Sequence, residues 1–189
     1  QHKSVIVGDY DADGATSTAL MILALREMGA QVEYLVPDRF KYGYGLTPAI
    51  ADLAFTSFTP DLLITVDNGI SSHDGVKQAQ DHGMQVIITD HHLTTKPTPR
   101  AQAVVNPNQL GCDFPSKALA GVGVAFYVLA NLSTYRKKLN KSSAVMSQYL
   151  DLVALGTYAD VASLDYNNRI LVDVGLKRIQ QHLSLIHIS

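Results

Sequence analysis

The sequence contains one cysteine, no tryptophan and no uninterrupted apolar stretch of about 18 residues, the minimum for a membrane helix. The lone cysteine, Cys112, excludes an intramolecular disulfide and a zinc site built from several cysteines. No basic residue adjoins it, so we interpret it as non-catalytic. Basic residues are not in excess, since 15 Lys and Arg stand against 17 Asp and Glu. The resulting formal charge of −2 is not that of a generally basic nucleic-acid binder. We expect no membrane association and a cytoplasmic, reducing location.

The chain has 189 residues, of which 47 % are hydrophobic and 17 % charged. This composition rules out wholesale disorder, and the length suits one domain with a helical appendage. The chain begins with Gln1 and shows no signal-peptide pattern, so we expect it to be cut from a longer protein.

Short β-rich segments alternate with helical patterns up to about residue 110. We predict strands at residues 4–8, 31–36, 62–66, 85–89 and 103–106. Helices are predicted at residues 15–28, from residue 48 behind a Thr47 cap, and at 72–82, with a loop at 38–46. After about residue 120 the pattern is mainly helical, at 122–132, 147–155 and 168–182. The predicted fold is therefore α/β, a parallel sheet of about five strands flanked by helices, with a helical C-terminal portion.

Aspartates and histidines follow the predicted strands. Asp9, Asp11 and Asp13 follow the first strand, Asp67 the third and Asp90-His91-His92 the fourth, while Asp160 follows a helical segment. Taken singly, each cluster fits a turn or a surface pair. The carboxyl ends of parallel strands lie at one edge of the sheet, where ligands bind, so three of these clusters can converge.

Converging carboxylates repel one another unless a cation compensates them. Aspartate with histidine suits a divalent ion, and imidazole favours Mn²⁺ over Ca²⁺ while Mg²⁺ remains an option. Several carboxylates at one site indicate two ions, an arrangement typical of phosphoryl displacement.

Four segments resemble the four motifs of the DHH phosphoesterase family, and most closely its bacterial single-stranded-DNA-specific exonucleases. They are VGDYDADGATSTA at 7–19, TVDNGIS at 65–71, TDHH at 89–92 and ALGTYADV at 154–161. The linking segments 37–46 and 114–126 match too, and the resemblance runs from about residue 5 to about residue 178. Four motifs in order make this signal far more specific than Asp-His-His alone.

The resemblance implies a centre of two divalent cations, Mn²⁺ first and Mg²⁺ second. The implied ligands are Asp9, Asp11, Asp13, Asp67, His91 and Asp160. Asp67 is the best candidate to bridge two ions. Asp9 either binds an ion directly or contacts the residues that do. Asp90 is expected to orient a histidine through its ring N–H. His92 is expected to contact the scissile phosphate, with simple packing as its alternative.

The implied reaction is the hydrolysis of single-stranded DNA from its 5′ end, which releases 5′-mononucleotides in DNA repair and recombination. The predicted phosphate contacts are Arg39, Lys117 and Arg169, together with Ser116 and the backbone of Gly121 and Gly123. Tyr44, with Tyr42 and Phe40, is predicted to stack on bases. The alternatives are a tight helix start for the two glycines and loop packing for the aromatic residues.

Full-length enzymes of this kind also carry a DHHA1-type domain and an OB-fold, which 189 residues cannot hold. We therefore expect residues 1–181 to be the DHH catalytic domain, weakly active alone, and residues 182–189 to be a tail of doubtful origin. The expected partner is single-stranded DNA with a 5′ end. By resemblance, a helicase and a single-strand-binding protein are further partners.

Two alternatives stay open. One is another enzyme of the superfamily, a phosphodiesterase for short oligonucleotides or cyclic dinucleotides, or a pyrophosphatase. A pyrophosphatase is expected to carry a histidine upstream of the paired aspartates, where this chain has Val7. The other is a non-catalytic DHH-like scaffold. Such scaffolds typically lose ligands, whereas all four motifs keep theirs here.

Overall fold

The computed structural model describes residues 2–181. The strands are β1 (Lys3–Gly8), β2 (Gln31–Leu35), β3 (Leu62–Val66), β4 (Gln85–Thr89) and β5 (Ala103–Val105). The helices are α1 (Ala12–Glu27), α2 (Arg39–Tyr42), α3 (Pro48–Phe58), α4 (His73–Asp81), α5 (Gly121–Lys138), the 3₁₀ turn η1 (Met146–Tyr149), α6 (Leu150–Ala159) and α7 (Tyr166–Gln180). The predicted tail, residues 182–189, lies outside the described residues, as does the last residue of the final predicted helix.

The five strands form one parallel sheet in the order β2-β1-β3-β4-β5. This confirms the predicted fold class. Strand β1 lies between β2 and β3, so the chain leaves β1 in one direction and later returns to its other side. Such a switch in strand order separates the loops that follow the two neighbouring strands, here β1 and β3, and opens a place for a ligand.

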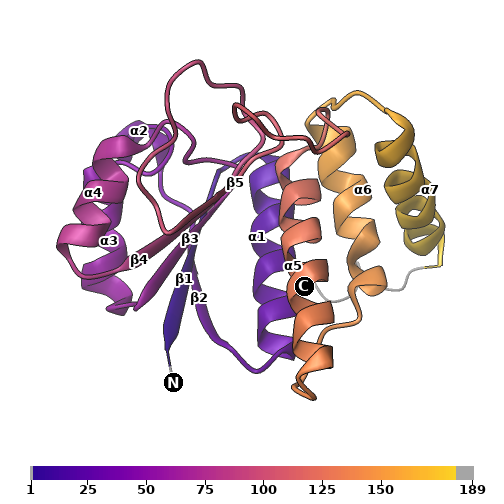
Figure 1. The fold of residues 1–189 in the computed structure, drawn as a ribbon, viewed down its shortest axis with the longest axis horizontal. Helices are drawn as coiled ribbons and strands as arrows, with labels where there is room; N and C mark the ends of the chain where they lie inside the picture. The colour runs from indigo at the N-terminus through magenta and orange to yellow at the C-terminus, as the bar shows by residue number, and fades with distance from the viewer. Residues whose placement is uncertain (1, 182–189) are drawn as a thin grey trace.

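Helices cover both faces of the sheet (Figure 1). Helices α3 and α4 pack on one face over a core that includes Val5, Ile50 and Leu63. Helices α1 and α5 pack on the other face, and α6 and α7 lie outside them over a core that includes Leu20 and Leu129. None of the helices in the described part of the chain has both the length and the apolar character needed to cross a bilayer.

Several element boundaries differ from the prediction. Helix α1 starts at Ala12 rather than residue 15, because the Asp11 side chain accepts a hydrogen bond from the Gly14 N–H and caps it. The predicted loop 38–46 contains the single turn α2, capped by Asp38. Helix α5 continues past residue 132 to Lys138, where basic residues favour a helix C-terminus. The predicted helix 147–155 is the turn η1 followed by α6.

Candidate metal centre

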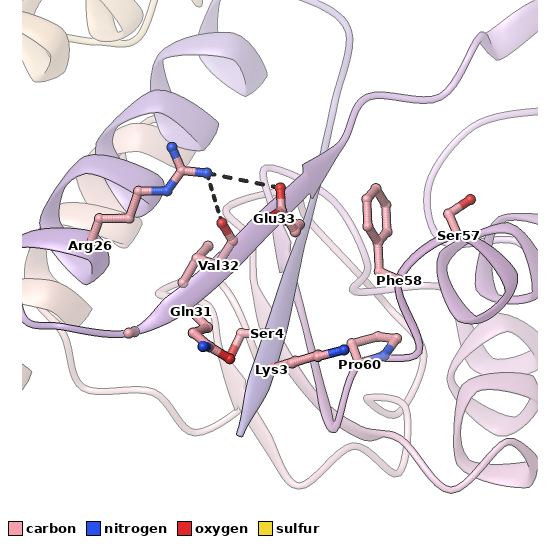
Figure 2. Close-up of a pocket in the computed structure, with 10 residues that line it drawn as sticks. Lys3, Ser4, Arg26, Gln31, Val32, Glu33, Ser57, Phe58 and Pro60 are labelled. Carbon is pink, nitrogen blue, oxygen red and sulfur yellow. Dashed lines mark hydrogen bonds and ion pairs between the residues drawn. The ribbon is translucent and has the colours of Figure 1, made fainter. Parts of the chain in front are cut away.

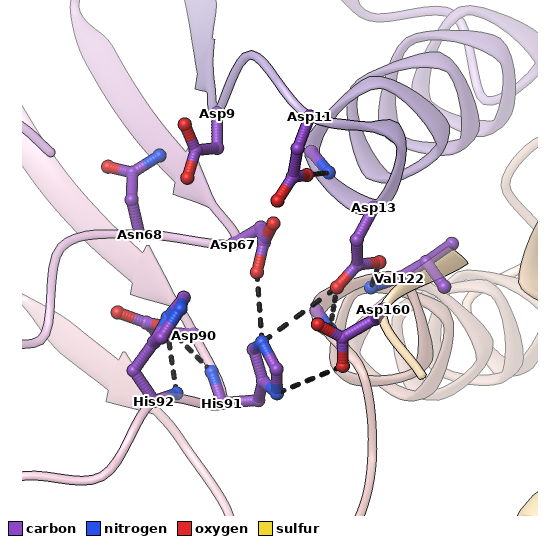
Figure 3. Close-up of polar contacts among 12 residues, drawn as sticks. Asp9, Asp11, Asp13, Asp67, Asn68, Asp90, His91, His92, Val122 and Asp160 are labelled. Atoms are coloured by element: carbon purple, nitrogen blue, oxygen red, sulfur yellow. Dashed lines mark hydrogen bonds and ion pairs between the residues drawn. The ribbon is translucent and has the colours of Figure 1, made fainter. Parts of the chain in front are cut away.

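The predicted acidic and histidine clusters meet at the carboxyl edge of the sheet (Figure 3). The loop from β1 to α1 brings Asp9 and Asp11 to the switch point, and the first turn of α1 adds Asp13, beside Asp67 at the end of β3. His91 follows β4, and Asp160 caps the C-terminal end of α6. The six side chains predicted as ligands therefore share one site although they come from four separate segments.

The contact between Asp67 and His91 is at the heart of this site. The Oδ1 atom of Asp67 and the Nε2 atom of His91 lie 3.1 Å apart, and both side chains are buried. The two atoms lack hydrogen-bond alignment, and neither has a hydrogen-bond partner among the described residues. Buried polar atoms without partners are costly, so a shared ligand that satisfies both would be stabilising.

The backbone at Asp67 is strained. Its φ angle is +61°, in the left-handed region that residues other than glycine seldom adopt. Its N–H donates to the Thr89 carbonyl across the sheet, at an N–O distance of 3.0 Å. Strain of this kind persists where the surroundings over-determine it, and it is concentrated at functional sites.

Asp13 attaches the start of helix α5 to this site. Its carboxylate accepts hydrogen bonds from the N–H groups of Gly121 and Val122, at 2.6 and 2.9 Å. A side chain at position 121 would not fit, because a Cβ there would lie 2.6 Å from Asp67 Oδ1. The helix N-terminus thus contributes its partial positive charge to the acidic cluster through direct contact with Asp13.

The proton affinities of these groups reflect the shortage of positive charge. Burial, together with neighbouring carboxylates, raises the pKa of Asp67 to about 7 although His91 opposes the shift. Burial lowers the pKa of His91, but Asp67, Asp13 and Asp160 outweigh it and raise that pKa to about 9. Burial also raises the pKa values of Asp9, Asp13 and Asp160. A bound cation would supply the missing positive charge and would favour the ionised form of these carboxylates.

The donor atoms fit divalent cations. Three overlapping groups each place their ligand atoms within 4.8 Å of one another: Asp9, Asp11 and Asp67; Asp13, His91 and Asp160; and Asp67, His91 and His92. Because the groups share Asp67 and His91, they match adjacent ions better than a single one. Carboxylate oxygens with one or two imidazole nitrogens suit Mn²⁺ and also accommodate Mg²⁺.

His92 is engaged differently from His91. Its Nδ1 atom lies 2.7 Å from Asp90 Oδ1, and its Nε2 atom lies 3.3 Å from the Tyr44 hydroxyl. The Asp90 hydrogen bond raises the pKa of His92. Burial alone would raise the pKa of Asp90, but hydrogen bonds from His92 and from the Ile70 N–H hold it below its usual value. Asp90 therefore orients His92 and leaves its Nε2 directed outward near Tyr44.

Arg39 lies at the border of the acidic cluster. Its guanidinium stacks over the Tyr10 ring, 4.3 Å from the centroid, and hydrogen-bonds the Tyr10 hydroxyl. The Tyr10 N–H in turn donates to Asp9 at 2.7 Å. Within residues 2–181, no carboxylate lies within ion-pair distance of Arg39, so its charge is held at the site without being neutralised there.

The other predicted substrate contacts have protein partners. Ser116 Oγ donates to Asp165 at 2.6 Å, and Lys117 Nζ donates to the carbonyls of Pro107 and Cys112, both at 2.6 Å. Arg169 Nε donates to the Leu164 carbonyl at 2.8 Å. Gly121 is the first residue of α5, and Gly123 packs on Leu119. Contacts within the protein therefore explain the positions of these five residues without any bound substrate.

Asparagines at the strand ends escaped the sequence reasoning. Asn68 is buried and donates to the carbonyls of Val7 and Val66, which joins β1 to β3 beneath Asp67. Asn106 and Asn108 donate to the carbonyls of His92 and His91. Asn68 lies just beyond the predicted strand 62–66, and Asn106 and Asn108 lie at and just beyond the end of the predicted strand 103–106. Position at a strand end is the signal that could have identified them, since it also marked the aspartates.

The opposite edge of the sheet holds a different hollow (Figure 2). A cavity of about 810 Å³ lies at the amino ends of β1 and β2, between the C-terminal ends of α1 and α3. Arg26 lines its wall. The Nη2 atom of Arg26 donates to the Val32 carbonyl at 2.8 Å and lies 3.9 Å from Glu33 Oε2. Among the described residues, none of the buried polar atoms without a partner lines this cavity.

Comparisons with known proteins agree with this geometry. Residues 3–157 match the model of the DHH family, N-terminal domain. Over 185 residues the chain is 52 % identical to the single-stranded-DNA-specific exonuclease RecJ of Escherichia coli, a match that covers 94 % of this chain and 32 % of that protein. The chain thus spans about a third of the length of such relatives.

Solved structures also show similarity to exonucleases of this family. A crystal structure of exonuclease RecJ bound to manganese superposes with a TM-score of 0.81 and 38 % identity, over 94 % of this chain and 44 % of that one. RecJ from Thermus thermophilus in complex with Mn²⁺ gives a TM-score of 0.77 and 36 % identity, over 94 % and 24 %.

Proposed function

The chain belongs to the DHH family, and from this premise we propose that it is the catalytic domain of a metal-dependent single-stranded-DNA exonuclease. The enzyme hydrolyses phosphodiester bonds from the 5′ end, releases 5′-mononucleotides and acts in DNA repair and recombination. One observation carries the proposal: the buried Asp67 and His91 atoms, 3.1 Å apart and without a hydrogen-bond partner, among further carboxylates. The identity to single-stranded-DNA-specific exonucleases selects the substrate class.

The proposed cofactors are two divalent cations, with Mn²⁺ preferred to Mg²⁺. Asp9, Asp11 and Asp67 would hold one ion, and Asp13, His91 and Asp160 would hold the other, with Asp67 as the candidate to serve both. When bound, the cations neutralise phosphoryl oxygens and lower the pKa of the attacking water. A third group, Asp67, His91 and His92, shares one residue with each of these two sets, which supports adjacent sites.

His92 and Asp90 are the proposed catalytic pair. Asp90 holds the His92 ring through Nδ1, which leaves Nε2 to donate a proton in a hydrogen bond to the scissile phosphate. The raised pKa of His92 favours the protonated, donating form. Tyr44, 3.3 Å from Nε2, borders the same space.

Arg39 and Tyr44 are the proposed substrate contacts that the geometry favours most. The Arg39 guanidinium has no carboxylate in ion-pair distance in the described chain, and it is free to bind a backbone phosphate. Tyr44 is half-exposed and offers a ring for base stacking. Ser116, Lys117, Gly121, Gly123 and Arg169 stay predictions as substrate contacts.

Residues 1–181 form the proposed catalytic domain, and the longer relatives are expected to add the DHHA1 and OB-fold domains that hold the strand. A helicase and a single-strand-binding protein are the proposed protein partners, and the DNA substrate implies a cytoplasmic location. The isolated chain is expected to be weakly active.

Segment exchange is the sharpest test. Replacing the matching 185-residue segment of the Escherichia coli relative with this chain restores the missing domains around it. We expect the chimera, with Mn²⁺, to release 5′-mononucleotides from 5′-labelled single-stranded DNA and to leave duplex DNA largely intact. The same chimera with Asp67→Asn is the inactive control.

Two results would contradict the proposal. A folded chimera that binds Mn²⁺ but releases no mononucleotides would exclude the exonuclease. A preference for dinucleotides over long strands would favour the oligonucleotide phosphodiesterase instead.

A further inference from the structure

We infer that Asn106 and Asn108 are positioning residues that hold the two histidines of the metal centre by their backbone carbonyls. Asn108 Nδ2 donates to the His91 carbonyl at 2.5 Å, and Asn106 Nδ2 donates to the His92 carbonyl at 2.9 Å. This role rests on the proposed metal-dependent function, because positioning matters only if His91 binds a cation.

The histidine segment needs such support because the sheet does not provide it. Strand β4 ends at Thr89, and residues 90–94 have no regular secondary structure. Asp90 Oδ1 accepts the N–H groups of His91 and His92, at 2.7 and 3.1 Å. The asparagines satisfy the two carbonyls, so side chains alone supply partners for all four backbone groups.

The asparagines are themselves fixed to the sheet. Strand β5 runs parallel to β4 with Val105 opposite Thr89, and the Asp90 N–H donates to the Val105 carbonyl at 3.1 Å. Asn106 is the next residue and is 1 % exposed. Its Oδ1 accepts the Asn108 N–H at 2.7 Å, which closes a turn and sets the direction of Asn108. The short edge strand β5 thereby determines where the histidines lie.

The two asparagines divide the task. Asn108 holds His91, the predicted metal ligand, whereas Asn106 holds His92 and also supports Asn108. Residues that orient a ligand typically contribute about 10–100-fold to metal affinity. Loss of the Asn108 amide should therefore weaken Mn²⁺ binding, because His91 is no longer held against Asp67.

The test measures Mn²⁺ binding to the 189-residue chain by calorimetry. Asn108→Ala removes the amide, and Asn108→Leu removes the donor while keeping most of the bulk. Ser133→Ala is the matched control, because Ser133 Oγ also makes a buried hydrogen bond to a backbone carbonyl, that of Ala144 at 2.7 Å, in the distant end of α5. We expect both Asn108 variants to bind Mn²⁺ about tenfold or more weakly and Ser133→Ala to bind like wild type.

A spectroscopic reading separates positioning from a general loss of stability. Electron spin-echo measurements on bound Mn²⁺ detect a ligated imidazole nitrogen. We expect that signal in wild type and in Ser133→Ala, and a reduced one in Asn108→Ala at saturating Mn²⁺. Thermal unfolding of the metal-free proteins checks that all variants are folded. Wild-type affinity and an unchanged nitrogen signal in folded Asn108→Ala would overturn the inference.

Failure of the proposed function would look different. If the chimera has no nuclease activity but Mn²⁺ binding still depends on Asn108, the function fails and the positioning role stands. If wild type is a nuclease and Asn108→Ala keeps its Mn²⁺ affinity, only the positioning role fails. Absence of Mn²⁺ binding in wild type would overturn both.

Discussion

The two ends of the sheet treat charge in opposite ways. At the carboxyl end, Asp13, Asp67 and Asp90 are buried, Asp67 and His91 leave buried polar atoms without hydrogen-bond partners, and Asp67 has a left-handed backbone. At the amino end, Asp61 accepts the Lys3 N–H at 2.8 Å, and Arg26 lies beside Glu33 with both side chains about half exposed. Asp61, Arg26 and Glu33 there each have a hydrogen-bond or ion-pair partner.

The difference shows that the carboxyl end of the sheet is the locally destabilised one. Both ends belong to the same strands and pack on the same cores, so the unpartnered atoms at one end are a local property and not a general looseness. Buried like charges are tolerated where a ligand compensates them. The comparison predicts that changes at the carboxyl end act through metal binding and that changes at the amino end act on stability alone.

The largest effect is expected at the carboxyl end of β3, with the amino end of the same strand as its control. Asp67→Asn keeps the shape of the side chain and removes the charge between the proposed ions. We expect calorimetry to show a loss of Mn²⁺ affinity of more than about 100-fold, beyond the usual effect of an indirect partner. Asp61→Asn, just before the same strand, should bind Mn²⁺ like wild type. Equal affinities for the two variants would break the comparison.

Metal binding should increase the stability of the folded chain, because it compensates the buried carboxylates. Mn²⁺ at 100 times its Kd should raise the free energy of unfolding by about 2.7 kcal/mol for each site filled, which for a chain of this size raises Tm by about 5–10 °C per site. Calorimetric unfolding with EDTA and with Mn²⁺ measures the shift. Asp67→Asn should show little shift at the same Mn²⁺ concentration. A similar shift in that variant would mean that the ion binds elsewhere.

Two glycines give a matched pair of smaller effects. At position 121 a Cβ would lie 2.6 Å from Asp67 Oδ1, so Gly121→Ala should cost about 1–3 kcal/mol by overpacking. Gly83 precedes β4 with φ +81°, and a Cβ added there would meet no other atom within 4 Å, so Gly83→Ala should cost about 1–2 kcal/mol through backbone strain alone. Although both variants lose stability, only Gly121→Ala should also bind Mn²⁺ more weakly. Weakened binding in Gly83→Ala would show that stability alone controls affinity.

The sequence could predict the site because its signals are local. A polar cluster directly after an apolar strand is visible in a few residues, and parallel pairing brings such ends together. The same reasoning explains why Asp9, Asp67 and His91, which were predicted to converge, lie close together in the structure. All three lie at or just beyond strand ends.

What the sequence could not predict depends on contacts between distant segments. Asp13 binds the start of α5, 108 residues away, and Ser116 is engaged by Asp165, 49 residues away. No periodicity or turn signal encodes such pairs, so the sequence could not show that the Gly121 N–H, a predicted phosphate contact, donates to Asp13. The asparagines that support the histidines are a different case, because their position at the end of a predicted strand is a local signal.

The smallest effect is expected at the amino-end cavity. Arg26→Gln removes an exposed ion pair with Glu33, and pairs of that kind contribute about 0–1 kcal/mol. Glutamine keeps a donor that can reach toward the Val32 carbonyl, so denaturant unfolding should change by less than about 1 kcal/mol. Mn²⁺ affinity should equal that of wild type, because the change lies at the far end of the strands from Asp67. If Arg26→Gln weakens Mn²⁺ binding, the strands transmit changes along their length and the two ends are not independent. If it leaves binding intact, the unpartnered charge at the carboxyl end is a property of the metal centre alone.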